Sequence, residues 1–312
     1  MTEETLQESG KFKDGTALAS RTAFLSLSFG LLGCERTSKG TEQEIETTAD
    51  KALLKVKKTL FESDEYAIIK REDSKFKTRV KKLCLAGLAD GIVTVPKGNV
   101  TRVFKLCAEH EVLRTGLVEA FKAAYPAIRD KALLLLGPLG DPKEYPPVEE
   151  VGEYFYFTYN FVTFDVPEML KGLDVEMAAQ QAKSHEKRMK DATEEIQQMR
   201  RALMLALVQK LQVELAGGTD AETGKEKRFH KSAITKLQAF LDEKEFAIMN
   251  VTDDQELAAL AATARNLMNG VSVDMVKNSD EFKAALTKEM AKLGDALKPL
   301  VEDKGRVIKD VV

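Results

Sequence analysis

Hydrophobic and polar residues follow two different periods along the chain. In the segment AFLSLSFGLL, residues 23–32, large and small side chains alternate with a period of two, which predicts a half-buried β-strand. Between residues 175 and 206, apolar residues recur at spacings of three and four, as in a coiled-coil helix. Shorter helical patterns fill much of the remaining chain. The sequence therefore predicts an α+β fold that is mostly α, with a small β-sheet and one long coiled-coil-like helix.

Start and stop signals predict three helices in the first half of the chain. The first covers about 41–61 and begins with a capping box. The second is expected over about 75–88, and a short extended segment, 92–95, follows it. The third covers about 101–136, and the ring of Pro126 should kink or split it.

Aromatic residues crowd into 154–164, which reads YFYFTYNFVTF and follows a proline-rich loop at 137–147. Such a segment has high β-propensity and is apolar on both faces, so we expect a strand buried on both faces. Pairing with the strand at 23–32 would satisfy its backbone. The two strands would then form a small sheet packed under helices.

The longest helix is expected to open at Pro167 and to run to Gly217. We interpret its heptad positions as an oligomerisation seam. Alanines at several of them permit close approach but bury little area, so a partner helix is needed, from this chain or another. His185 would fix the register of pairing rather than bind a ligand. The seam consists of Val175, Ala178, Ala182, His185, Met189, Ala192, Ile196, Met199, Leu203 and Ala206.

Changes in pattern divide the chain into four segments. A flexible tail, 1–20, precedes a helical domain, 21–216, that holds the small sheet and the long helix. A polar linker, 217–231, leads to a C-terminal helical module, 232–312, which either continues the layer of the long helix or forms a separate bundle. Helix starts in this module are expected at Ser232, Thr252 and Ser279.

The charge balance disfavours a general polyanion binder. The chain has 47 basic and 50 acidic residues, a net charge of −3, and therefore no field that would steer it to nucleic acid or to an anionic membrane. One local stretch, 70–82, is basic and could follow phosphates. We interpret it instead as a solvated helix face, because its charges spread around the helix. The possible nucleic-acid contacts are Lys75, Lys77, Arg79, Lys81 and Lys82.

Motifs that would carry catalysis, a cofactor or a metal are incomplete. His110-Glu111 begins like a zinc protease motif, but Arg114 stands where its second histidine is required. The glycines and lysine at 218–225 have the wrong spacing for a phosphate loop. The three cysteines, Cys34, Cys84 and Cys107, fit reduced and buried thiols. We therefore expect a protein that is not an enzyme, has no cofactor and no metal, and stays in the cytoplasm without entering a membrane.

A series of short motifs resembles an uncharacterised family. In order these are the strand FLSLSFG, a helix ending in KTLF, the segment GIVTVP, the tripeptide AYP, a PP-acidic turn, an aromatic strand, and a VP pair that opens a long helix. This order is similar to domain of unknown function 3150, which phages, plasmids and bacteria carry. The resemblance covers roughly residues 20–216. It implies a gene neighbourhood with a MoxR-type AAA ATPase and a von Willebrand A-type protein, and it brings no catalytic residues.

The pattern and the resemblance together predict a non-enzymatic assembly or adaptor protein of phage or plasmid type in a bacterial host cell. It would act through helix-mediated oligomerisation, or as the partner of a MoxR-type AAA ATPase remodelling system. The alternative is a nucleic-acid-associated phage or plasmid protein that uses the basic helix at 70–82. Whether an AAA ATPase gene or recombination genes lie next to this one would discriminate between the two functions.

Overall fold

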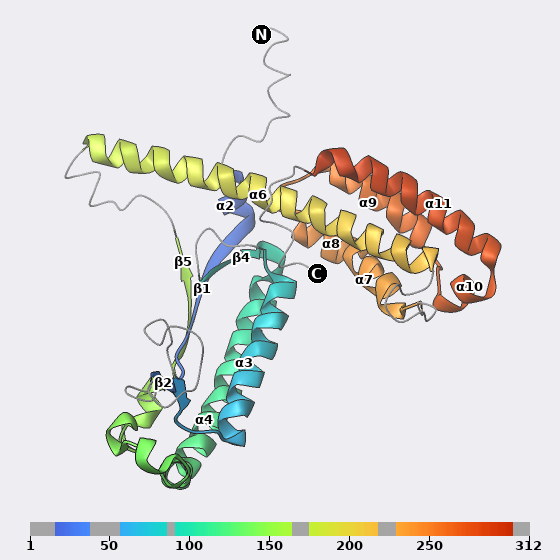
Figure 1. Ribbon diagram of the computed structural model, residues 1–312. Helices are drawn as coiled ribbons and strands as arrows, with labels where there is room; N and C mark the ends of the chain where they lie inside the picture. Colours follow the sequence, from blue (N-terminus) through green and yellow to red (C-terminus); the bar gives the residue numbers. More distant parts are fainter. Residues whose placement is uncertain (1–15, 38–56, 86–90, 164–174, 218–228, 302–312) are drawn as a thin grey trace, which may run out of the picture.

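The structure is a computed structural model that describes five parts of the chain, residues 16–37, 57–85, 91–163, 175–217 and 229–301. A small sheet with two long helices forms one body, and a helical bundle forms the other. One long helix, α6 (Val175–Ala216), belongs to both bodies (Figure 1). The expected class, mostly α with a small β-sheet and one long helix, is confirmed.

The sheet has three antiparallel strands in the order β4-β1-β5. The central strand, β1 (Thr22–Phe29), pairs with β4 (Ile92–Pro96) on one side and with β5 (Phe157–Val162) on the other. Leu25 lies opposite Val93 of β4 and Phe161 of β5. The predicted strand is confirmed for residues 23–29 but not for 30–32, and its pairing with the aromatic segment and the extended segment at 92–95 are confirmed.

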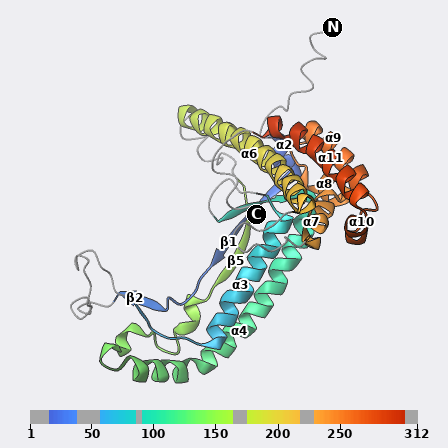
Figure 2. The ribbon, with the colours of Figure 1, turned by 45° about the vertical axis from the view of Figure 1, so that its right-hand side comes forward.

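Helices cover both faces of the sheet. Successive side chains of β1 point to opposite faces, and β1 has apolar side chains on both of them. Leu25 belongs to a core that also contains Phe76 of α3 (Asp64–Leu83) and Leu106 of α4 (Val100–Leu136). α3 and α4 lie side by side along this face (Figures 1 and 2). Phe24 faces the other way and packs with Leu18 of the short helix α2 (Thr16–Arg21) and with Met189 of α6.

The end of this body away from the bundle is built from turns around an aromatic core. The strands β2 (Glu35–Thr37) and β3 (Lys57–Thr59) pair there. Two buried tyrosines fasten the loops: Tyr66 donates to the carbonyl of Leu32 and Tyr145 to that of Leu60. The 3-10 turns around this core are η5 (Gly137–Leu139), η6 (Pro142–Glu144) and η7 (Val151–Tyr154).

The second body is a bundle in which the C-terminal half of α6 is a core helix. Met204, Val208, Leu211 and Leu215 are buried at helical spacing among the side chains of the helices that follow. Helix α6 and the C-terminal module, which lie on either side of the segment expected to be a linker, thus share one hydrophobic core. The other helices are α7 (Lys231–Leu241), α8 (Glu243–Met249), α9 (Gln255–Met268), α10 (Val273–Asn278) and α11 (Asp280–Leu297), with the 3-10 turns η4 (Lys97–Asn99) and η8 (Lys298–Leu300) beside them.

Several expected helix boundaries are wrong. α3 begins at Asp64, eleven residues before the expected start, because the hydroxyl of Ser63 caps it by accepting from the backbone N–H of Tyr66. The helix expected to end near Phe61 is replaced at its end by β3, and its earlier part lies outside the described residues, as does the opening of the long helix at Pro167.

The remaining helix expectations had mixed outcomes. Thr16–Arg21 forms a helix instead of ending a flexible tail, since Leu18 is buried against the sheet. α4 continues through Pro126 as one helix and bends in its lower part (Figure 2). In the bundle, α11 starts after the expected cap Ser279, whereas α9 is capped by Asp254 instead of Thr252.

The aromatic segment is less buried than expected. Only Phe157–Val162 is a strand, and Tyr154, Tyr156 and Phe161 are each between 44% and 51% exposed. Tyr154 and Tyr156 precede the strand, and within β5 the core formed with α3 and α4 includes Phe157 and Tyr159 but not Phe161. On the opposite face of β5, the polar residues Thr158 and Asn160 are exposed. The expectation of burial on both faces was therefore wrong.

Candidate functional site: the projecting half of helix α6

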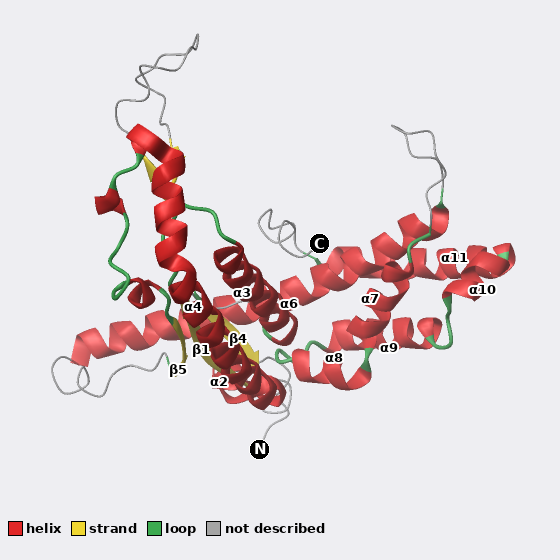
Figure 3. Cartoon of the chain, turned by 90° about the horizontal axis from the view of Figure 1, so that it is seen from below, coloured by secondary structure: helices red, strands yellow, loops and turns green. Residues whose placement is uncertain are grey.

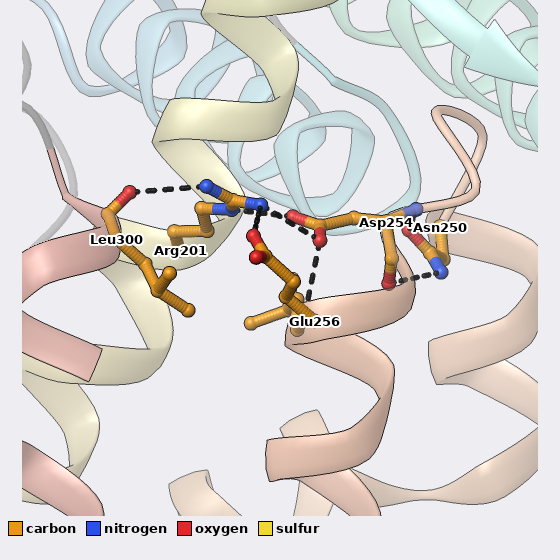
Figure 4. A network of polar contacts seen from close by, with 6 residues as sticks. Arg201, Asn250, Asp254, Glu256 and Leu300 are labelled. Atoms are coloured by element: carbon orange, nitrogen blue, oxygen red, sulfur yellow. Dashed lines mark hydrogen bonds and ion pairs between the residues drawn. The ribbon is translucent and has the colours of Figure 1, made fainter. Parts of the chain in front are cut away.

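An ion-pair network fixes α6 against the bundle at Arg201 (Figure 4). The Nε and Nη2 atoms of Arg201 donate to the two carboxylate oxygens of Asp254, at 2.6 and 2.9 Å. Nη2 also donates to Glu256 at 2.7 Å, and Nη1 to the carbonyl of Leu300 at 3.3 Å. A bidentate pair holds both distance and orientation, so this contact fixes α6 to the N-terminus of α9.

Asp254 binds Arg201 and also caps the N-terminus of α9. Its Oδ1 accepts from the backbone N–H of Leu257 at 3.0 Å. Burial alone would raise the pKa of Asp254. The hydrogen bonds from Arg201 and Leu257 and the charge of Arg201 outweigh burial, and the pKa is lowered from its ordinary value of 3.8.

The neighbouring Arg200 has different surroundings. Its guanidinium lies over the rings of Phe240 and Phe246, at 4.5 and 5.3 Å from their centroids. Its Nε and Nη2 atoms are buried and have no hydrogen-bond partner among the described residues. Burial lowers the pKa of Arg200 to about 10. The two arginines together attach α6 to α7, α8 and α9.

The middle of α6 lies on the sheet. Met189, Ala192 and Ile196 are buried together with Leu18 and Phe24. These three α6 residues are seam positions predicted from the heptad pattern. In this chain their partners are β1 and α2.

The first third of α6, residues 175–188, projects beyond the sheet, away from the bundle (Figures 1 and 3). Val175 is its first residue. Ala182 is exposed, and Ala178 and His185 are half-buried. The seam register that is buried at Met189 therefore continues onto a helix that the described residues leave largely uncovered. We call residues 175–188 the projecting half of α6.

The last predicted seam positions do not form the buried face. Met199 and Leu203 are half-buried, whereas Arg200 and Met204 are buried. A straight α-helix has 3.6 residues per turn and drifts by about 20° per heptad from a strict heptad stripe. The buried stripe accordingly moves by one residue where α6 leaves the sheet and enters the bundle.

The predicted nucleic-acid contacts lie on α3 and are all exposed. The Nζ of Lys75 lies 2.7 Å from Glu72, and that of Lys77 lies over the ring of Phe29. At 100° per residue the basic positions spread over more than half of the circumference of α3, and they do not form one stripe. The five residues are Lys75, Lys77, Arg79, Lys81 and Lys82.

The sequence did not predict a buried polar cluster that lies between α3 and α4. Asp73 accepts from Arg114 Nε at 3.0 Å and lies 2.9 Å from His110 Nε2. Arg114 Nη2 donates to the carbonyl of Gly30 at 2.6 Å, and Phe76 stacks on His110. A signal was present, because Asp73 interrupts the apolar face of a helix, and His110 and Arg114 are spaced i, i+4.

This cluster has the composition of a catalytic dyad but not its setting. A catalytic dyad would need a nucleophile beside His110. The thiol nearest to His110 in sequence, that of Cys107, is fully buried, and burial raises its pKa to about 11. Burial likewise raises the pKa of Cys84 to about 12, so neither thiol is a thiolate nucleophile near neutral pH. We interpret the cluster as a link that joins α3, α4 and β1.

The other candidate groups are dispersed. His230 is exposed, and its backbone N–H donates to Glu214. The residues 218–225 lie outside the described residues. Within the described ranges, no three histidine, cysteine or acidic side chains are grouped as metal ligands would be, and no helix has the length and apolar character needed to cross a bilayer.

The chain was compared with protein-family models, curated proteins and solved structures, and none of them matches it.

Proposed function

We propose that this chain is a non-enzymatic assembly protein whose projecting half of α6 pairs with the same helix of a second copy. The observation that supports the proposal is the continuity of the seam. One register is buried at Met189, Ala192 and Ile196, and it continues onto Ala178, Ala182 and His185. The small side chains of Ala178 and Ala182 permit two helix backbones to approach closely.

The anchoring of α6 supports the same function. An isolated helix of 14 residues is marginally stable in water, so it would make a poor docking element by itself. Here it continues a helix of 42 residues whose later turns are held by the sheet, by Arg201 and by the bundle core. A preformed helix loses less conformational entropy on binding than one that must first fold.

A matched pair of variants tests where the association occurs. Ala178→Asp with Ala182→Asp places two charges on the seam. Gln180→Asp with Ser184→Asp places two charges at the same i, i+4 spacing, about 200° further round the helix. None of the four positions is buried, so both variants should fold.

We expect the wild-type chain and the Gln180/Ser184 variant to have a mass in solution that is a multiple of 34.6 kDa, and the Ala178/Ala182 variant to have a mass of 34.6 kDa. Light scattering coupled to size exclusion measures this mass, and circular dichroism checks the helix content. Equal masses for the two variants would refute pairing through the seam. A helical partner such as the MoxR-type AAA ATPase implied by the family resemblance would then be tested on the same surface.

A further inference from the structure

Among the described residues, the strand β5 is hydrogen-bonded along one edge only, and we call the other edge its free edge. β1 occupies one side, and no other strand of the described residues pairs with β5. Two backbone hydrogen bonds of the β1 segment show which of its residues bond to β5 and which to β4. Gly30 N–H donates to the carbonyl of Tyr156 at 2.8 Å, whereas Leu27 N–H donates to Gly91, on the side of β4.

Backbone groups of an antiparallel strand point alternately to its two sides. The backbone carbonyl of Tyr156 accepts from the β1 side, so the backbone groups of residues 158, 160 and 162 also point to β1. The N–H and C=O groups of Phe157, Tyr159 and Phe161 therefore point to the free edge. Three donors and three acceptors in one extended row form a template for a further strand.

Natural edge strands are usually protected by lysine, proline or a bulge. The β5 sequence, FTYNFV, contains neither lysine nor proline, and its register with β1 is unbroken. Phe161 is 45% exposed, and on the flank of α4 Phe104 is 51% exposed and packs edge-on against Tyr159. An added strand would cover these rings.

A cavity of about 530 Å³ opens at the beginning of β5. It lies between α4 and the residues that lead into the strand. Two cations line it, and both have carboxylate partners: Arg114 pairs with Asp73, and Lys122 pairs with Glu119. The carboxylates that remain unbalanced in the lining are those of Glu111, Glu149 and Glu153.

We propose that the free edge of β5 binds an extended, basic segment of a partner protein by strand addition. The backbone of the segment pairs with Phe157, Tyr159 and Phe161. A lysine or arginine of the segment enters the acidic cavity, where charge complementarity sets the direction and register of binding. This surface is separate from the projecting half of α6.

The backbone part of the proposal is tested at one position. Phe161→Pro removes an N–H that points to the free edge and leaves the ladder to β1 intact, whereas Phe161→Ala removes the same ring and keeps the N–H. The probe is a fluorescein-labelled peptide of eight alternating lysines and valines, measured by fluorescence anisotropy. We expect the affinity of the proline variant to be about tenfold lower than that of the alanine variant.

The charge part is tested by Glu149→Gln with Glu153→Gln, and Glu194→Gln with Glu195→Gln on α6 is the matched control. The first pair should weaken binding and reduce its salt dependence, and the control should not. If Phe161→Pro does not fold, the comparison between the two glutamine pairs tests the proposal by itself. The proposal is overturned if the wild-type chain does not bind the peptide, if the proline and alanine variants bind it equally, or if both glutamine pairs act alike. Self-association that Phe161→Pro abolishes would also overturn it, in favour of edge pairing between two copies.

Discussion

At the scale of single residues, Arg200 and Arg201 are neighbours on α6 that differ in what satisfies their charge. Arg201 pairs with the buried carboxylate of Asp254, while Arg200 has aromatic rings beside it and two buried nitrogens, Nε and Nη2, that have no hydrogen-bond partner among the described residues. Removal of one member of a buried ion pair leaves the other charge uncompensated. Replacing Arg201 should therefore destabilise the fold far more than replacing Arg200.

We predict that Arg201→Met lowers the free energy of unfolding by about 3–5 kcal/mol, because Asp254 loses its cation. Arg200→Met should change it by less than about 1 kcal/mol or increase it, since the lost cation–π contact is offset by relief of the unpaired N–H groups. Urea denaturation followed by circular dichroism measures both. A greater loss for Arg200→Met would show that the environment of this side chain has been misinterpreted.

Asp254 also gives stability a pH dependence with a defined sign. Its pKa is lower in the folded than in the unfolded chain, so its contribution is present above its ordinary pKa of 3.8 and is lost as the pH falls through the folded value. We predict that the stability difference between the wild-type chain and Asp254→Asn is constant near pH 6 and shrinks below about pH 4. A difference that grows on acidification would contradict the assignment.

The buried cluster of Asp73, His110 and Arg114 gives a third test at this scale. Asp73→Asn keeps the size of the side chain but removes the charge that both partners contact, and we predict a loss of about 3 kcal/mol or more. Glu72→Gln, one residue earlier and on the surface of α3, should lower the stability much less, because exposed ion pairs contribute little. Equal effects in thermal unfolding would show that the cluster is not a link between α3, α4 and β1.

At the scale of elements, the basic residues of α3 give an expectation for nucleic acid. Lys75 pairs with Glu72, Arg79 lies 3.9 Å from Glu109, and the cations do not form one stripe. We predict weak or absent DNA and RNA binding at about 150 mM salt, because few phosphates can be contacted at once. Sub-micromolar affinity that Lys77→Glu, Arg79→Glu and Lys81→Glu abolish would establish the nucleic-acid alternative.

Element types could be predicted from the sequence better than element ends or side-chain partners. The strand at 23–32, its aromatic neighbour and the long helix all followed from hydrophobic periodicity, which responds to burial over many residues. The start of α3 depends on one hydroxyl, that of Ser63, and was missed. The burial of β5 depends on which of its residues α3 and α4 cover, which no local pattern contains.

The candidate site could be predicted only in part, because the heptad pattern shows which residues are buried but not what covers them. The heptad pattern placed Met189, Ala192 and Ile196 on a buried face correctly, but it did not show that the sheet of the same chain covers them. It also extended too far, since the buried stripe moves to Arg200 and Met204 in the bundle. Asp73 was overlooked because a single acidic residue on an apolar helix face gains meaning only when its partners on another helix are known.

At the scale of the whole molecule, α6 is the structural link between the two bodies. Its last turns are part of the bundle core, its middle lies on the sheet, and its first third projects from both (Figure 1). Anchoring of α6 at the bundle, through Arg201, and at the sheet, through Met189, fixes the direction in which the projecting half points. The proposed assembly function depends on this arrangement.

The most direct test of that function is the mass of the wild-type chain by sedimentation equilibrium over a range of micromolar concentrations. Pairing through the projecting half of α6 predicts a weight-average mass that rises with concentration from 34.6 kDa toward a multiple of it. A mass of 34.6 kDa at every concentration would contradict the account.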